Sequence, residues 1–397
     1  TSASTLGSKN KVFEPRFAFN YTFDSERQMQ LRGGVGLFQT VAPYVWLTNP
    51  YANNGVVSPK GYNGTNPVAD PFNPDPANQP GPTNVQAGVC ATNARCTIDV
   101  LDPDFKMPGA WKFALGFDTE LPWWGLTGSI EYQHIKSKNA IDYKLPNIGT
   151  PNGTLPDGRD SYWTAGYGSS KNNGSFRELD YQSTLLTNTN KGKSDSITFS
   201  LTKALSNGFR GNFSITQTHS TDVTPGTASR AISNYNYVAR VNPNDSIEST
   251  ARFDVPLSVK ASMSWEHAFF GDYKTTVSMY YNGRNGLPYS WTFGTDVNGD
   301  SINNVDLAYI PLANDPIVSY KAGTTAAQIQ AFQAFIDSDP YLSSRRGQIA
   351  ERNSSHQPWI NQLDVGFQQE LPGFFKGNKV VVRLDIYNFL NMVNKDW

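Results

Sequence analysis

The chain has 397 residues and 17% charged residues, below the roughly 25% of soluble domains. Its 33 basic and 34 acidic residues leave a net charge of −1, which does not favour nucleic-acid binding. No apolar stretch approaches the ~18 residues of a membrane-spanning helix, so helical membrane proteins are excluded. The first residues also lack the charged and apolar regions of a signal peptide, so we expect any export signal to lie upstream.

Ten segments alternate apolar and polar residues with a period of two, which is typical of strands with two different faces. In one of them Leu363, Val365 and Phe367 share a face, and Asp364 and Gln368 share the other. Each segment is close to the ~9–11 residues that a tilted strand needs to cross a bilayer. The segments are Phe13–Phe23, Met29–Leu37, Trp111–Leu121, Leu126–His134, Ile197–Leu205, Phe209–Gln217, Leu257–Trp265, Val277–Gly283, Leu363–Leu371 and Val380–Ile386.

The connections between these segments alternate between very short and very long. Short turns join the strands in pairs at Asp24–Arg27, Pro122–Gly125, Ser206–Gly208, Phe270–Asp272 and Pro372, and about 30 to 75 residues separate one pair from the next. Outer-membrane barrels have this asymmetry, with short periplasmic turns and long extracellular loops. A sandwich or propeller has no reason to segregate loop length in this way. The sequence therefore predicts an all-β fold, an antiparallel transmembrane β-barrel.

Two loop segments have patterns of their own. Counting the strand-like Leu179–Thr187 as a membrane crossing would place the later short turns at the same end of the barrel as the long loops. We therefore predict a loop hairpin or an extracellular strand extension there. Thr325–Asp337 places Ile329, Phe332 and Ile336 on one helical stripe, with a threonine as a suitable N-cap. We predict one helix in an extracellular loop, whose stripe packs on neighbouring loops or contacts the ligand.

One loop sequence has the spacing of a calcium site. Oxygen-bearing side chains alternate from residue 296 to 306, as in EF-hand and dockerin-like loops, and Ca²⁺ requires six to eight oxygen ligands. Ser301 replaces the usual turn glycine, however, and Asp306 lies one place short of the last ligand in those loops. The alternatives are a structural Ca²⁺ site and a polar turn without metal. The predicted ligands are Asp296, Asn298, Asp300, the Ile302 carbonyl, Asn304 and Asp306.

The remaining chemistry of the sequence is sparse. Cys90 and Cys96 lie together in a loop rich in Pro, Gly and Asn, which favours a short-loop disulfide over two unpaired thiols. Neither an H-E-x-x-H motif nor a nucleophile elbow is present, so we predict no enzymatic activity and no required cofactor. Asp364, Arg383 and Asp385 are expected to line a wet lumen or to contact a plug. The four histidines are scattered at His134, His219, His267 and His356.

Six stretches carry a family resemblance: Leu31–Phe38, Pro43–Leu47, Glu120–Gly125, Arg346–Asn353, Pro358–Asp364 and Gln369–Gly373. They resemble TonB-dependent outer-membrane receptors of the Oar-like group, and the similarity extends over most of the chain. The resemblance implies a 22-stranded barrel with an N-terminal plug domain and a TonB box. Ten strands are too few to close such a barrel, so we expect residues 1–397 to be a partial C-terminal barrel domain whose plug, TonB box and last strands lie outside this chain.

The resemblance implies TonB-dependent active transport across the bacterial outer membrane. The partners that it implies are outer-membrane lipid, the protein's own plug domain, the TonB complex and an unknown extracellular ligand. Loops rich in Asn, Gly, Tyr and Trp suit a glycan or a peptide ligand equally, and the resemblance implies a large ligand that can also be a protein. The alternatives are a passive porin, a surface adhesin or receptor that transports nothing, and a soluble binding protein of sandwich type.

Overall fold

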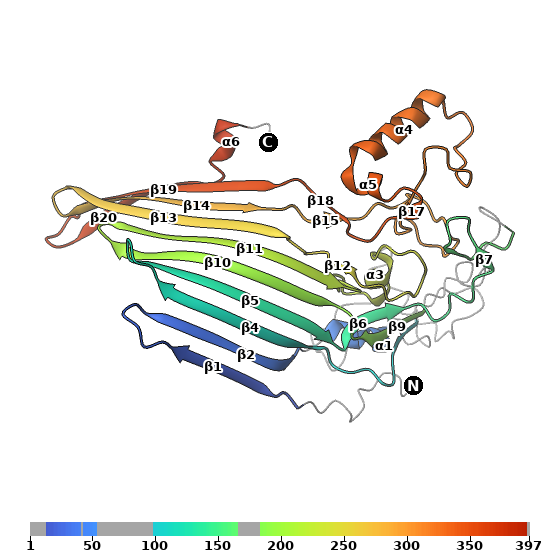
Figure 1. The fold of residues 1–397 in the computed structure, drawn as a ribbon, viewed down its shortest axis with the longest axis horizontal. Helices are drawn as coiled ribbons and strands as arrows, with labels where there is room; N and C mark the ends of the chain where they lie inside the picture. The colour runs from blue at the N-terminus through green and yellow to red at the C-terminus, as the bar shows by residue number, and fades with distance from the viewer. Residues whose placement is uncertain (1–12, 41–42, 54–97, 166–182, 395–397) are drawn as a thin grey trace, which may run out of the picture.

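The computed structural model describes residues 13–40, 43–53, 98–165 and 183–394. Ten long strands form one antiparallel sheet in which each strand pairs with the next long strand along the chain, and the short β12 (Ser249–Thr250) also pairs with β11 (Figure 1). All ten predicted strands are confirmed, several of them longer than predicted. The strands are β1 (Arg16–Thr22), β2 (Met29–Gln39), β4 (Gly109–Glu120), β5 (Leu126–Lys138), β10 (Lys193–Ser206), β11 (Phe209–Asp222), β13 (Leu257–Phe270), β14 (Tyr273–Arg284), β19 (Ile360–Pro372) and β20 (Lys379–Ile386).

The register places apolar side chains on one face of the sheet and polar side chains on the other. Trp265, Val277, Phe367 and Leu384 are directly opposite one another across β13, β14, β19 and β20. In the described part of the chain, no second layer covers this apolar face, and Phe199 at its centre is 41% exposed. An uncovered apolar face fits contact with lipid and does not fit a sandwich, in which a second sheet would cover it.

All five short turns lie at one end of the sheet and all long connections at the other (Figure 1). At the turn between β10 and β11, Asn207 and Gly208 have φ values of 51° and 74°. This left-handed pair matches the twist of a two-residue hairpin. The predicted segregation of turns and loops is therefore confirmed. In the described residues β1 and β20 each have one neighbour in the sheet, and closure into a 22-stranded barrel stays a prediction.

The described parts of the long connections pack together beyond one end of the sheet, and we call them the loop lobe. The predicted loop strand is confirmed in its described part, since β9 (Ser183–Thr189) pairs with β3 (Ile98–Leu101) and β6 (Ala140–Lys144) outside the main sheet. Apart from β12, the elements off the main sheet are α1 (Tyr44–Ala52), β3 (Ile98–Leu101), β6 (Ala140–Lys144), β7 (Gly153–Thr154), β8 (Asp160–Ser161), β9 (Ser183–Thr189), α3 (Ala231–Asn236), β15 (Pro288–Tyr289), β16 (Tyr309–Ile310), α4 (Ala326–Ser338), α5 (Pro340–Ser344), β17 (Gln348–Ile349), β18 (Ser355–His356) and α6 (Leu390–Val393).

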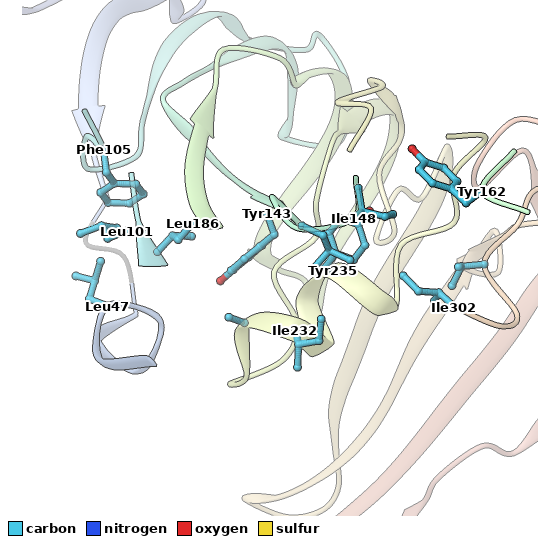
Figure 2. Close-up of a cluster of buried hydrophobic side chains, with 13 residues drawn as sticks. Leu47, Leu101, Phe105, Tyr143, Ile148, Tyr162, Leu186, Ile232, Tyr235 and Ile302 are labelled. Atoms are coloured by element: carbon cyan, nitrogen blue, oxygen red, sulfur yellow. The ribbon is translucent and has the colours of Figure 1, made fainter. Parts of the chain in front are cut away.

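The hydrophobic core of the described chain lies in this lobe and not under the sheet. Its largest cluster joins residues from α1, β3, β6, β9, α3 and the loops after β3, β6, β8 and β15 (Figure 2). Since residues from so many segments share one core, the lobe is a folded unit and not a set of separate loops. The buried members are Leu47, Leu101, Phe105, Tyr143, Leu145, Ile148, Tyr162, Leu186, Ala231, Ile232, Tyr235, Ile302 and Val305.

The predicted loop helix is α4, and its start is a capping box. The expectation of a single loop helix was wrong, because the described loops also contain the shorter helices α1, α3 and α5. The Thr325 hydroxyl accepts a hydrogen bond from the Gln328 backbone N–H, and the Gln328 side chain accepts one from the Thr325 backbone N–H. Of the predicted stripe, Ile336 is buried in a second cluster with Ile310, Leu342 and Ala350, whereas Phe332 is 42% exposed. The helix therefore packs on neighbouring loops through one end of its stripe.

Candidate functional site

The polar face of the sheet carries charged side chains that pair across strands. Arg32 on β2 bonds Asp118 on β4 at 2.8 Å and Glu131 on β5 at 2.5 Å. On β20, Arg383 Nε lies 3.0 Å from Asp385 Oδ1. The adjacent strands β2, β4 and β5 thus contribute to one ion-pair network around Arg32, on the face opposite the apolar side chains. Such a face is suited to a wet passage.

The residues predicted to line the lumen all lie on this polar face. Asp364, Arg383 and Asp385 alternate with Val365 and Leu384, which lie on the apolar face. The Asp364 carboxylate accepts a hydrogen bond of 2.8 Å from the Asn388 backbone N–H, which ties β19 to the segment after β20. Contact of these side chains with a plug stays a prediction.

A hollow of about 730 Å³ on the polar face of β1, β2, β4 and β5 was not predicted. Phe38 lies in its wall, with Arg16 at 4.4 Å and Lys112 at 5.4 Å from the ring centroid. Glycine lets strands β1 and β2 approach closely in this wall, since a Cβ at Gly34 would lie 2.7 Å from the Phe17 carbonyl oxygen. The signal in the sequence was the glycine-rich stretch of β2, which the alternation pattern does not evaluate.

The acidic turn, residues 296–306, brings most of the predicted calcium ligands into one buried loop. Asp296, Asn298, Asp300 and Asp306 are between 1% and 7% exposed, and Ile302 is also buried, whereas Asn304 is exposed. Asp296 accepts hydrogen bonds from the backbone N–H groups of Gly299 and Ser301, at 2.7 and 2.8 Å. These are the side-chain-to-backbone bonds of a tight Asx-rich turn.

Buried negative charge in the acidic turn changes the protonation of its carboxyl groups. Burial, followed by the charges of Asp306 and Asp296, raises the pKa of Asp300 to about 8. Burial raises the pKa of Asp306 to about 6, although the Val297 N–H bond and the charge of Arg159 oppose the shift. Arg159 lies nearby, but its Nη1 atom is 3.8 Å from Asp306 Oδ1. The turn is therefore short of positive charge.

The acidic turn is held against the segment after β8. The Tyr162 N–H donates to the Asn298 carbonyl at 2.7 Å, and Trp163 Nε1 donates to the Val297 carbonyl at 2.8 Å. Tyr162 and Ile302 belong to the large core cluster and are both drawn in Figure 2. The carboxylates are thus fixed to the core of the loop lobe, and a change of charge in the turn will affect the stability of the lobe.

Two further observations concern metals and membrane helices. In residues 13–40, 43–53, 98–165 and 183–394, no cluster of three or more His, Cys, Asp or Glu side chains is placed to hold a metal ion. A metal in the acidic turn would therefore rely on amide and carbonyl oxygens as well as carboxylates. Within the same ranges no helix has both the length and the apolar composition of a membrane span. Cys90 and Cys96 lie outside the described residues.

His134 lies on the apolar face near the loop lobe, opposite Phe113 of β4. Its Nδ1 is 2.7 Å from Asp195 Oδ1 on the neighbouring strand, and the Tyr132 hydroxyl donates to the same oxygen at 2.7 Å. In the lobe, His356 Nε2 is 3.8 Å from the buried Asp254. Both histidines thus have a carboxylate neighbour, and neither contact needs a catalytic explanation.

A second cavity, of about 190 Å³, lies within the loop lobe and was also not predicted. It is lined by residues of six separate segments, among them Arg252 and Arg352. Arg352 is 5% exposed and donates to the Asp222 carboxylate at 2.7 Å, 130 residues away in the chain. No local pattern relates residues so far apart, so the sequence carried no signal for this site.

The chain is similar to a known protein family. The family model described as an outer membrane beta-barrel domain matches residues 1–396. No curated protein matches the sequence.

Three solved structures with a similar arrangement are much longer than this chain. The ferric enterobactin receptor of Pseudomonas aeruginosa has 10% identity and a TM-score of 0.42, with 95% of this chain and 34% of that chain covered. The outer membrane transporter YddB of Escherichia coli has 11% identity and a TM-score of 0.45, with 91% and 35% covered. The siderophore receptor PirA of Acinetobacter baumannii has 10% identity and a TM-score of 0.42, with 95% and 37% covered. This chain therefore spans about a third of their length. Because the family model matches nearly all of its residues, the chain belongs to the outer membrane β-barrel domain family of the bacterial outer membrane.

Proposed function

We propose that this chain forms part of the wall of a TonB-dependent transporter whose loop lobe captures a large ligand at the cell surface. The observation that carries the proposal is the pairing of two surfaces on one sheet. The apolar face suits lipid, and the charged face with its 730 Å³ hollow suits a wet passage and a plug. The loop lobe, which has its own hydrophobic core, lies at one end of the sheet and offers the ligand a preformed surface.

The proposal is tested with the full-length natural protein expressed in bacterial cells with and without the TonB complex. Uptake of a fluorescent peptide mixture is measured with and without a protonophore. Active transport predicts accumulation that requires both TonB and the proton gradient. A passive porin would accumulate the same peptides without either, and an adhesin would bind them at the surface without accumulation. Either of the last two results would reject the proposal.

We also propose that the acidic turn holds a structural Ca²⁺. The ligands would be Asp296, Asn298, Asp300, Asp306 and the Ile302 carbonyl, which together supply the oxygen donors that calcium prefers. Support comes from the raised pKa values of Asp300 and Asp306, because a divalent cation would compensate the buried charge that raises them. The ion would hold this turn against the core of the loop lobe.

A further inference from the structure

The cavity of about 190 Å³ in the loop lobe has the composition of an anion site. Its polar lining includes Arg252, Arg352, Thr292, Asn304 and Tyr237, and none of the described side chains that line it is acidic. We call it the arginine cavity. Its volume is roughly six times the ~30 Å³ that a water molecule occupies in the liquid, so it accommodates the end of a ligand and not a whole peptide.

The two arginines of the arginine cavity have different roles. Arg352 is buried and donates to both the backbone carbonyl and the carboxylate of Asp222, so its charge is already compensated. Arg252 is exposed, and among the described residues its guanidinium forms no ion pair, although its backbone N–H donates to the Asp222 carboxylate. The cavity thus contains one uncompensated positive charge at its surface.

Glu351, which precedes Arg352, is paired with Arg345, and two further carboxylates close in sequence to the lining are also engaged elsewhere. Asp306 accepts a hydrogen bond from the Val297 N–H at 2.7 Å, and Arg159 lies on its other oxygen. Asp254 accepts from the Ser220 N–H at 2.7 Å and is 2% exposed. Neither group forms an ion pair with Arg252, so both leave it available for an anionic ligand.

The walls of the arginine cavity are held in place without any ligand. The Asn353 side chain donates to the Thr250 carbonyl at 2.8 Å, and the Asn353 backbone N–H donates to the Ser290 hydroxyl at 2.8 Å. These bonds join three segments of the lobe that are distant in sequence. A preformed site of this kind loses little conformational entropy on binding.

We propose that the arginine cavity binds a carboxylate group of the ligand, with Arg252 as the charged anchor and Thr292 and Asn304 as hydrogen-bond donors. A guanidinium forms short, charge-assisted hydrogen bonds with a carboxylate, and side-chain hydroxyl and amide groups complete its shell. The carboxylate can be the C-terminus of a peptide or an acidic side chain. The inference rests on the proposed capture of a ligand by the loop lobe and specifies the chemistry recognised there.

The test is calorimetric titration of the full-length natural protein in detergent with four tripeptides. Two carry one carboxylate, acetyl-Gly-Gly-Gly at its C-terminus and acetyl-Gly-Glu-Gly-amide on its side chain. Two are their neutral counterparts, acetyl-Gly-Gly-Gly-amide and acetyl-Gly-Gln-Gly-amide. We expect at least one carboxylate peptide to bind about tenfold more tightly than its neutral counterpart. The peptide that shows the larger ratio identifies the source of the carboxylate.

Two variants connect the binding to the cavity. Arg252→Gln is expected to lower the affinity for the carboxylate peptide about tenfold, and Arg27→Gln, an exposed arginine in the turn at the other end of the sheet, to leave it unchanged. Equal affinity for charged and neutral peptides, no effect of Arg252→Gln, or binding weaker than about 10 mM for all four peptides overturns the inference. None of these measurements requires transport. The inference and the uptake assay therefore fail independently.

Discussion

At the scale of single residues, the acidic turn concentrates unfavourable charge in a small buried volume. Asp300 is 4% exposed and Asp306 is 2% exposed, and both have raised pKa values. In the unfolded chain both carboxyl groups have ordinary values near 3.8. Between those values and the folded ones, the folded state binds more protons than the unfolded state. The stability of the metal-free lobe must therefore fall as the pH rises.

The fall in stability with rising pH gives a prediction for the protein without metal. In EDTA the lobe is expected to unfold at a lower temperature at pH 8 than at pH 5, because Asp300 and Asp306 must lose their protons while buried. Calcium at 100 times its dissociation constant is expected to stabilise the lobe at pH 8 by about 2.7 kcal/mol. Tryptophan fluorescence during thermal unfolding measures both effects.

Asp300→Asn removes one buried carboxylate and leaves the other residues of the turn unchanged. The variant is expected to lose most of the pH dependence and most of the calcium effect, whereas Asp104→Asn, an exposed acidic residue of the same lobe, keeps both. Unfolding temperatures that are equal at the two pH values and unchanged by calcium would show that the turn is a polar Asx turn without metal.

At the scale of elements, the turns are constrained by backbone conformation. Gly208 has φ 74°, and a Cβ at this position would lie 2.2 Å from the backbone carbonyl oxygen of Glu266 on β13. Gly377 in the turn before β20 has φ 89°, but no atom lies within 4 Å of its Cβ position. The two glycines therefore share the left-handed conformation and differ in the space around them.

Gly208→Ala is expected to impair folding of the sheet, because strand β13 would have to move to relieve the clash. Gly377→Ala is expected to cost only the ~1–2 kcal/mol of placing a side chain in the left-handed region. The shift of folded barrels in unheated gels measures both variants. If the two alanine variants fold to the same extent, the close approach of β13 is not a constraint on the turn.

Helix α4 offers a second contrast at the same scale. Ile336 is 1% exposed, while Phe332 on the same predicted stripe is 42% exposed. Ile336→Ala is expected to destabilise the loop lobe by about 2–5 kcal/mol, and Phe332→Ala by much less, since only the first leaves a buried cavity. Hydrogen exchange of the α4 amides measures the difference. Similar losses of protection in the two variants would show that the whole stripe is buried.

At the scale of the whole molecule, the two faces of the sheet are expected to meet different solvents. Phe199 lies on the apolar face near the middle of β10, and its neighbour Thr198 lies on the polar face, where it bonds the Thr216 hydroxyl at 3.0 Å. Successive side chains of a strand point to opposite faces. A charge placed at adjacent positions therefore enters lipid in one case and the wet passage in the other.

Phe199→Arg is expected to destabilise the folded protein in lipid vesicles by about 2–4 kcal/mol, the cost of an arginine on the lipid face near the bilayer midplane. Thr198→Arg is expected to cost less than half as much, because water solvates the charge on the polar face. Urea unfolding in vesicles, followed by tryptophan fluorescence, compares the two. Equal costs would mean that the apolar face is not in contact with lipid.

The ten strands, the order of their pairing and the rim of each turn were all predictable from the sequence. The reason is that the pleat of a strand repeats every two residues, so the face of Phe199 or Arg383 follows from its position alone. The helix α4 was predictable for the same reason, since its cap and its apolar spacing are local features. The limits of the strands were less certain, because pairing extends β13 and β14 beyond their apolar repeats.

The loop lobe, by contrast, depends on contacts that no local pattern describes. Arg352 meets Asp222 across 130 residues, and the core of the lobe joins segments from Leu47 to Val305. Such contacts arise only when the sheet brings the ends of distant strands to one rim, where the loops then bury apolar area against one another. Local periodicity therefore determined the ten-stranded sheet. Long-range packing determined the arginine cavity and the burial of the acidic turn.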